Sequence, residues 1–230
     1  MAEVALIVGA GSGLSAALAR LFTKDGMRVA LAARDSKKLD GLCAETGARA
    51  YACDATKPDD VASLCQAVER ELGAPDVVVY NAGQRVRGSI TEVDTAAVQQ
   101  SLMSTAYGGF LVAQQAARRM LEKGRGTLLF TGASASVKGY PRSAPFAMGK
   151  FALRGLSQAL ARELHPQNIH VCHVVIDGGI GRAGDPRQAE RGADGLLAPD
   201  AIAQTYLQLH RQHRSAWAWE IELRPWRETF

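Results

Sequence analysis

The sequence of 230 residues predicts a single α/β domain, with a doubly wound, Rossmann-like parallel sheet between two layers of helices. Three observations support this prediction. Short apolar runs alternate with longer amphipathic runs along almost the whole chain. A glycine-rich segment directly follows the first apolar run. No linker or internal repeat divides residues 1–230, so one domain is expected.

Six apolar runs are expected to form strands that are buried on both faces, because most of them carry no polar alternation. Parallel strands that are joined through helices need right-handed crossovers, which cover the sheet on both sides. A further run, Ala216–Leu223, is expected to add a last strand at the edge. The six runs are Val4–Val8, Arg28–Ala33, Ala48–Cys53, Asp76–Tyr80, Gly126–Thr131 and Asn168–Ile176.

The longer runs between these strands predict helices. The run that begins at Pro58 has proline in its first turn, where the missing N–H has no helical partner to lose. The segment Gly178–Pro199 is rich in glycine, proline and charge, so we expect an irregular, mobile substrate flap. The expected helices are Leu14–Lys24, Lys37–Glu45, Pro58–Leu72, Ala96–Leu121, Ala144–Leu164 and Ala201–His210.

The composition argues against several classes of protein. The four cysteines are scattered, with no C-x-x-C pair and no histidine at a metal-ligand interval, so we expect reduced thiols and no metal site. The first residues turn glycine-rich after one short apolar run, unlike a signal peptide or a membrane span. The net charge of +4, with arginines frequent after Arg182, favours an anionic ligand, but no basic block suggests nucleic acid. We expect a cytoplasmic protein without nucleic-acid or membrane partners.

The segment Gly9-Ala10-Gly11-Ser12-Gly13-Leu14 lies between the first expected strand and the first expected helix. Glycines at such a turn let the backbone approach a pyrophosphate, and the helix N-terminus offers free N–H groups and a favourable dipole. A turn of this kind can also serve packing alone. The segment therefore indicates dinucleotide binding when other motifs agree with it.

Further motifs agree, and together they resemble the short-chain dehydrogenase/reductase family over almost the whole chain. The family's T-G-x-x-x-G-x-G corresponds to residues 8–15, although Val8 lacks the hydroxyl and Ser15 replaces the last glycine. Asp54 follows the third strand, where a carboxylate accepts from the adenine amine, and N-A-G follows the fourth. The resemblance implies cofactor contacts at Gly9, Gly11, Ser12, Gly13, Leu14, Asp54, Ala55, Asn81, Ala82, Gly83, Lys150, Gly178 and Ile180.

The end of the second expected strand indicates which cofactor binds. A carboxylate there would bind the ribose 2′-hydroxyl and repel a 2′-phosphate, but the sequence has Ala33 followed by Arg34. A guanidinium can pair with a phosphate through two hydrogen bonds. We therefore expect NADP(H) to be preferred, with NAD(H) still possible. A solvated arginine at the start of a loop is the alternative.

The family's catalytic positions are mostly changed. In the family a tyrosine exchanges the proton, a lysine lowers its pKa and holds the nicotinamide ribose, and a serine and an asparagine assist. Aligned on Lys150, the tyrosine position holds Phe146 and the serine position holds Ala133, with Ser134 as the nearest hydroxyl. The asparagine position holds Thr105. The usual P-G-x-x-x-T has become residues 177–182, without the proline or the threonine.

Because a phenyl ring has no proton to give, another acid is needed for catalysis. Tyr140 in the loop before the expected helix is the first candidate, and Tyr107 and Asp177 are others. One interpretation is an oxidoreductase in which Lys150, Ser134 and Tyr140 act on a carbonyl, enone or acyl substrate. The alternative is a catalytically silent NADP(H)-binding protein that acts through partner binding or regulation.

Two expected helices carry apolar residues on more than one face, which favours association between copies of the chain. Members of the family commonly pair through these two helices, so the resemblance implies a homodimer or a homotetramer. The residues are Leu102, Met103, Phe110, Leu111 and Met120 in the first helix, and Phe151, Leu153, Leu156 and Leu160 in the second.

Overall fold

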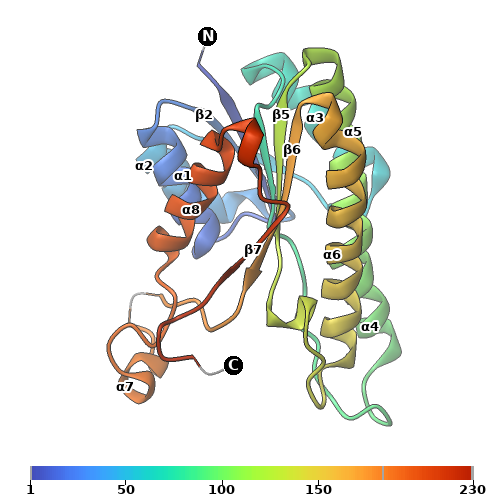
Figure 1. The fold of residues 1–230 in the computed structure, drawn as a ribbon, viewed down its shortest axis with the longest axis vertical. Helices are drawn as coiled ribbons and strands as arrows, with labels where there is room; N and C mark the ends of the chain where they lie inside the picture. The colour runs from blue at the N-terminus through green and yellow to red at the C-terminus, as the bar shows by residue number, and fades with distance from the viewer. Residues whose placement is uncertain (1, 183, 229–230) are drawn as a thin grey trace.

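A seven-stranded parallel sheet runs through the part of the chain that the computed structural model describes, residues 2–182 and 184–228 (Figure 1). Its strand order is β3-β2-β1-β4-β5-β6-β7. This order reverses direction between β1 and β4, as in a doubly wound sheet. The strands are β1 (Val4–Val8), β2 (Arg28–Ala33), β3 (Arg49–Ala52), β4 (Val77–Tyr80), β5 (Gly126–Thr131), β6 (Ile169–Ile176) and β7 (Glu220–Leu223).

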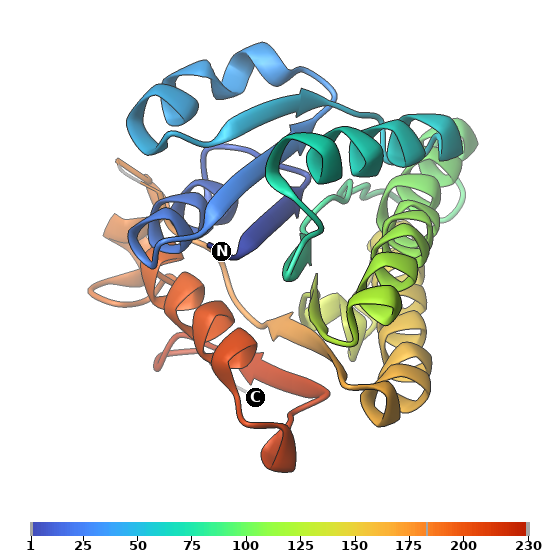
Figure 2. The same cartoon turned by 90° about the horizontal axis from the view of Figure 1, so that it is seen from above.

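Helices cover both faces of this sheet (Figure 2). Helices α1 and α8 pack on one face, and α3, α5 and α6 pack on the other. Every residue of β1, β4 and β6 is buried, as the absence of polar alternation predicts. The helices are α1 (Leu14–Lys24), α2 (Asp40–Thr46), α3 (Pro58–Leu72), α4 (Thr95–Leu102), α5 (Gly108–Lys123), α6 (Ala144–Leu164), α7 (Arg187–Arg191) and α8 (Pro199–Arg211).

The long helix expected over Ala96–Leu121 forms, with a change of geometry in its middle. A π-helical segment, Met103–Tyr107, separates α4 from α5. The hydroxyl of Tyr80 donates to the carbonyl oxygen of Ser104 in this segment at 2.5 Å. Gly108 follows it, and a Cβ there would lie 2.4 Å from the Tyr80 oxygen. The prediction of a helix here is confirmed, but its geometry changes from α to π where a tyrosine from the sheet packs into it and the glycine leaves space.

Two other boundaries also differ from expectation. The helix expected over Lys37–Glu45 begins as a 3₁₀ turn, Ser36–Leu39, before α2. The last strand begins at Glu220 rather than at Ala216, because the preceding residues turn to bring the indole N–H of Trp217 onto the carbonyl oxygen of Gln212 at 3.0 Å.

The segment expected to be a flap has more structure than predicted. Residues 178–182 and 184–199 include α7, and Ile180 bridges Leu197 in a parallel pair. The carboxylate of Asp185 accepts from the backbone N–H of Arg187 at 3.1 Å and also binds the guanidinium of that residue. The expectation that this segment forms neither helix nor strand was therefore wrong, and its mobility stays a prediction.

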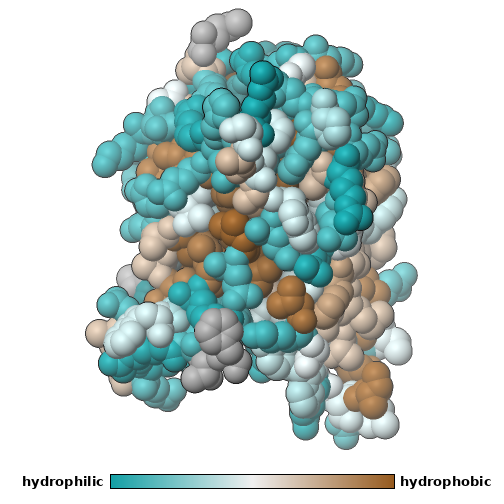
Figure 3. Space-filling view, in the orientation of Figure 1, coloured by the Kyte–Doolittle hydropathy of each residue, from teal (hydrophilic) through white to brown (hydrophobic). Residues whose placement is uncertain are grey.

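The cysteines are as the sequence predicts. The four cysteines are free, and three of them are buried. No helix in the described residues is long and apolar enough to cross a membrane. Figure 3 shows a largely hydrophilic face, with apolar residues gathered in its centre and paler brown residues along the side of α6.

Candidate active site

The loop between β1 and α1 lies against the end of β4. Gly9 has φ of +85°, and a Cβ on it would lie 2.4 Å from the backbone nitrogen of Ala82. The N–H groups of Gly9 and Ala10 both donate to the carbonyl oxygen of Ala32, at 3.0 and 2.9 Å. Gly9 is therefore required for packing. A Cβ on Gly11 or Gly13 would meet nothing within 4 Å, so these two glycines leave open space above the loop.

Ser15 fits the position where the family has its last glycine. Its hydroxyl donates to the carbonyl oxygen of Gly9 at 3.1 Å and accepts from Nδ2 of Asn81 at 2.8 Å. The side chain is buried. The serine therefore links the glycine-rich loop to the N-A-G segment. The sequence showed only that a serine replaces the glycine and gave no sign of this link.

A cleft of about 480 Å³ opens along the carboxyl ends of β1 to β4. Gly13 and Leu14 are not among its lining residues, because Gly13 caps α1 and the side chain of Leu14 is buried in the core. The predicted cofactor residues that line it are Gly9, Gly11, Ser12, Arg34, Asp54, Ala55, Asn81, Ala82 and Gly83.

Side chains of both charges line the far end of this cleft. Arg34 and Lys38 line it together with Asp35 and Asp54, and Lys38 lies 3.4 Å from Asp35. Burial alone would raise the pKa of Asp54, but bonds from the N–H and the hydroxyl of Thr56 and the nearby cations hold it below its usual value. Asp54 is therefore a fixed carboxylate, and exposed Arg34 makes no ion pair within residues 2–182 and 184–228.

A second pocket of about 250 Å³ continues this cleft towards α6, and Asn81 and Gly83 line both. The carboxyl ends of β5 and β6, the start of α6 and the first residues of the flap enclose it. The predicted residues Ser134, Lys150, Gly178 and Ile180 line it, together with Phe146 and Ala133. The two pockets thus form one groove across the sheet edge, which parallel sheets typically use for ligands.

Lys150 lies buried at the base of the second pocket. Its Nζ donates to the carbonyl oxygen of Thr131 at 2.7 Å. Burial lowers its pKa to about 8. No carboxylate in the described chain forms an ion pair with it. An ammonium group without a counter-ion in this position can donate to a bound ligand.

Phe146 lies one helical turn before Lys150, and its ring is flanked by two cations. Nζ of Lys150 lies 6.0 Å from the ring centroid, and Cζ of Arg85 lies 5.5 Å from it. Arg85 also lines the second pocket. Sequence reasoning did not identify Arg85, although its place two residues after N-A-G was a signal that could have found it.

The remaining candidates for the serine and asparagine roles differ in environment. Ser134 is half-buried and begins a short 3₁₀ turn on the pocket wall. Thr105 is almost completely buried, and its Oγ1 has no hydrogen-bond partner among the described residues. A Cβ on Gly83 would lie 3.3 Å from that oxygen, so Thr105 lies directly behind the cleft.

The candidate acids lie away from the pocket or are already paired. Tyr140 is 42% exposed, and neither it nor Tyr107 lines the cleft or the second pocket. Asp177 is buried and accepts from Lys138 at 3.2 Å and from Arg224 at 2.8 Å. The role of Tyr140 as a proton donor stays a prediction without support from this geometry, and Asp177 is held as a paired carboxylate.

A partly buried ion-pair network supports α6 below the pocket. Arg154 binds Glu220 through two bonds at 2.6 and 2.7 Å, and Glu220 lies 3.0 Å from Nδ1 of His173. Burial lowers the pKa of His173 to about 4, so its imidazole is neutral. A Cβ on Gly132 would lie 2.4 Å from Nε2 of His173. This network therefore holds the floor of the pocket.

Comparisons with known proteins agree with this fold. A short-chain dehydrogenase from Rhodopseudomonas palustris is 33% identical, with a TM-score of 0.84 over 97% of this chain and 99% of the other. A metagenomic short-chain oxidoreductase, solved in complex with NADP, is 26% identical, with a TM-score of 0.84 over 97% of both chains. An uncharacterized oxidoreductase of Staphylococcus aureus is 26% identical over 229 residues, 97% of both chains. The sequence pattern of the short chain dehydrogenases matches residues 3–179. The chain therefore belongs to the short chain dehydrogenase family.

Proposed function

We propose that this protein is an NADP(H)-dependent oxidoreductase that acts on a carbonyl, enone or acyl substrate. The observation that carries the proposal is the continuous groove along the carboxyl edge of the sheet, with Lys150 buried at the inner end. The metagenomic relative solved with NADP supports the choice of cofactor.

The residues along the groove fit a dinucleotide. The open space above Gly11 and Gly13 and the start of α1 suit a pyrophosphate. The exposed guanidinium of Arg34 suits a 2′-phosphate, and Asp54 suits the adenine amine. Ammonium N–H groups of Lys150 beyond the one bound to Thr131 suit ribose hydroxyls. A bound NADPH supplies a hydride to the substrate.

The protein's own groups must then handle the proton and the substrate oxygen. Phe146 cannot donate a proton. Lys150 is the acid that the geometry favours, because it lines the pocket and burial brings its pKa to about 8, close to neutral pH. The hydroxyl of Ser134 lies on the same pocket wall and can donate to the substrate oxygen.

A second function is a catalytically silent NADP(H)-binding protein that acts through partner binding or regulation. Phe146, Ala133 and Thr105 favour it, because three of the family's four catalytic side chains are replaced. The two functions share cofactor binding and differ in turnover.

The test of both measures NADPH binding by its fluorescence and NADPH oxidation with aldehydes, ketones, enones and acyl thioesters. The proposed function requires turnover that Lys150→Met lowers by about 100-fold or more. Binding without turnover on any class would favour the silent function, and absence of NADPH binding would contradict both.

We further propose that the protein works as a homodimer or a homotetramer in the cytoplasm, with α5 and α6 as the contact. Leu111, Met120 and Leu153 face the core, but Phe110 and Phe151 are 43% and 45% exposed. Exposed aromatic residues on two adjacent helices suit an interface, and the free cysteines suit a reducing compartment. Light scattering should give a dimer or tetramer mass, which Phe151→Asp should lower. A monomer mass for the natural protein across the micromolar range would contradict this assembly.

A further inference from the structure

The second pocket carries positive charge that no lining carboxylate balances. Arg85 and Lys150 both line it. The residues that line it within the described part of the chain include no aspartate or glutamate. At about 250 Å³ it has room for a small substrate. An unbalanced pair of cations in a cleft favours an anionic ligand.

The ring of Phe146 supports Arg85 without occupying its hydrogen-bond donors. The guanidinium carbon lies 5.5 Å from the ring centroid. Within residues 2–182 and 184–228, Arg85 forms no hydrogen bond or ion pair. A guanidinium held by an aromatic ring keeps its planar set of N–H groups available for a carboxylate.

The surroundings of Arg85 add to the positive potential. Arg85 is exposed, and partial desolvation together with the neighbouring charges of Arg87 and Arg187 lowers its pKa. Arg187 is neutralised by Asp185 at 2.6 Å, whereas exposed Arg87 forms no ion pair with a described residue. Asp177 is paired with Lys138 and Arg224. The charge of Arg85 therefore remains available to a ligand.

We propose that this pocket selects substrates in which a reducible carbonyl group is joined to a carboxylate, with Arg85 binding the carboxylate and Lys150 facing the carbonyl oxygen. The proposal rests on the proposed oxidoreductase function. In the reduction, a hydride adds to the carbonyl carbon and a proton to its oxygen, so that the carbonyl compound, NADPH and one proton become an alcohol and NADP⁺. Phe146, which cannot exchange a proton, then serves to orient Arg85.

The kinetic test uses two aldehydes of similar shape, 4-carboxybenzaldehyde and its neutral methyl ester. For the natural protein we expect kcat/KM to be about 10- to 100-fold higher for the acid, the range for a charge-assisted bond. Arg85→Met should remove this preference by slowing the acid alone. Arg87→Met is the matched control from the same loop, and it should change the preference by no more than about threefold because Arg87 does not line the pocket. Equal rates for the two aldehydes in the natural protein would overturn the proposal.

A binding test separates this proposal from the proposed reaction. Calorimetry on the protein saturated with NADP⁺ should show that benzoate binds about 10-fold or more tightly than benzamide, and that Arg85→Met loses the difference. Selective benzoate binding without turnover of either aldehyde would contradict the reaction but support the site. Equal binding of benzoate and benzamide would overturn the site. A loss of NADPH affinity in Arg85→Met as large as the loss for benzoate would also overturn it, because Arg85 would then bind the cofactor.

Discussion

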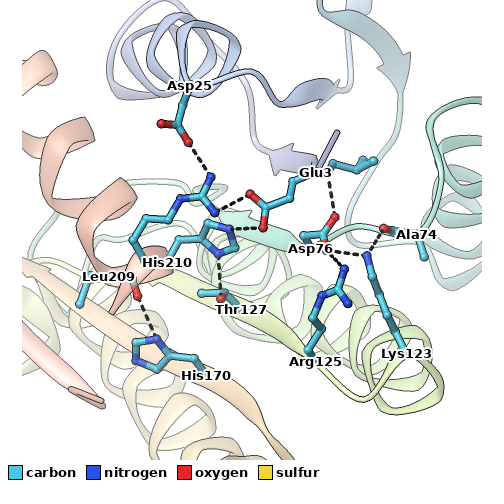
Figure 4. Close-up of polar contacts among 12 residues, drawn as sticks. Glu3, Asp25, Ala74, Asp76, Lys123, Arg125, Thr127, His170, Leu209 and His210 are labelled. Atoms are coloured by element: carbon cyan, nitrogen blue, oxygen red, sulfur yellow. Dashed lines mark hydrogen bonds and ion pairs between the residues drawn. The ribbon is translucent and has the colours of Figure 1, made fainter. Parts of the chain in front are cut away.

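The two edges of the parallel sheet carry charge in opposite ways. At the amino edge, where the strands begin, Asp76 accepts from the N–H of Val4 at 3.0 Å and from Nζ of Lys123 at 2.5 Å (Figure 4). Nearby Glu3 binds Arg211, which also reaches Asp25 at 2.6 Å. Each of these carboxylates therefore has a cation, and the network links the first strand to the ends of α1, α5 and α8.

At the carboxyl edge, buried Lys150 and exposed Arg85 have no such partners among residues 2–182 and 184–228. Lys150 donates to a neutral carbonyl oxygen, and Arg85 lies over an aromatic ring. A charge with an ionic partner can stabilise the folded state. A buried charge without a partner destabilises it, so such a charge is expected where it binds a ligand. The comparison indicates that partners, rather than burial alone, distinguish a structural ion pair from a functional group.

The largest effect is expected for Lys150→Met. If Lys150 is the proton donor, the variant should lose about 100- to 10,000-fold in reduction rate, the usual contribution of a positioned acid. Its NADPH affinity should also fall, because the ribose loses a donor. Its melting temperature should be unchanged or higher, since the variant removes a buried charge that has no counter-ion among the described residues. Initial rates, fluorescence titration and thermal unfolding measure the three effects. A markedly lower melting temperature would mean that Lys150 is structural.

The same lysine predicts a pH dependence. An acid must be protonated to act, so the reduction rate should fall as the pH rises through the Lys150 pKa of about 8. The rate profile of the natural protein between pH 6 and 10 measures this, with NADPH saturating throughout. A rate that stays constant up to about pH 10 would contradict the assignment of Lys150 as the donor.

The next largest effect is expected for stability at the amino edge. Asp76→Ala removes the acceptor for Lys123 and for the N–H of Val4, which should cost about 2–3 kcal/mol of unfolding free energy. Urea unfolding measures this loss. Glu122→Ala is the control, because Glu122 is exposed and its replacement should change the unfolding free energy by close to zero. A change below about 0.5 kcal/mol for Asp76→Ala would show that the paired charges at this edge contribute nothing to the free energy of unfolding.

The ionisation of Asp76 should appear in the stability of the natural protein. Burial would raise its pKa, but the bonds from Lys123 and Val4 keep the pKa of the folded state below its usual value. The resulting stabilisation is present above the unfolded-state pKa of about 4 and is lost as the pH falls through the folded-state pKa. Asp76→Ala should therefore flatten this part of the acid-unfolding curve.

A smaller effect is expected at the distal end of the groove. Arg34→Ala should weaken NADPH binding by about 10- to 100-fold and leave NADH binding little changed, because only NADPH has the 2′-phosphate. Fluorescence titration with both cofactors measures this. Equal losses for the two cofactors would show that Arg34 does not recognise the phosphate.

The smallest effect is expected for Phe146→Tyr. It restores a phenol, but the serine and asparagine positions hold Ala133 and Thr105, and residues that act as a unit are strongly non-additive. NADPH affinity should be unchanged, and ketone reduction should rise by at most about tenfold. Rates on one ketone panel compare the variant with the natural protein. A gain of about a thousandfold would mean that the phenol alone had been missing.

The sequence alone determined the sheet and the position of the cleft along its carboxyl edge. Buried parallel strands produce uninterrupted apolar runs, so β1, β2 and β5 begin and end where these runs predict. The glycine-rich loop is local, since its residues are neighbours in the chain and their function depends on backbone freedom. Phe146 and Lys150 could be placed on one helix face because their separation is one turn.

Only the tertiary structure decided how the inner end of the groove is built. Arg85 and Phe146 are 61 residues apart, and no periodic pattern relates a loop after β4 to a helix after β5. The same reason hid the bond from Tyr80 to Ser104 that accompanies the π-helical segment, and the exposure of Tyr140 away from the pocket. Local patterns determine which elements form, but contacts between distant side chains depend on how those elements pack. The lack of an ion-pair partner for Lys150 among the described residues could likewise be recognised only once its neighbours were in place.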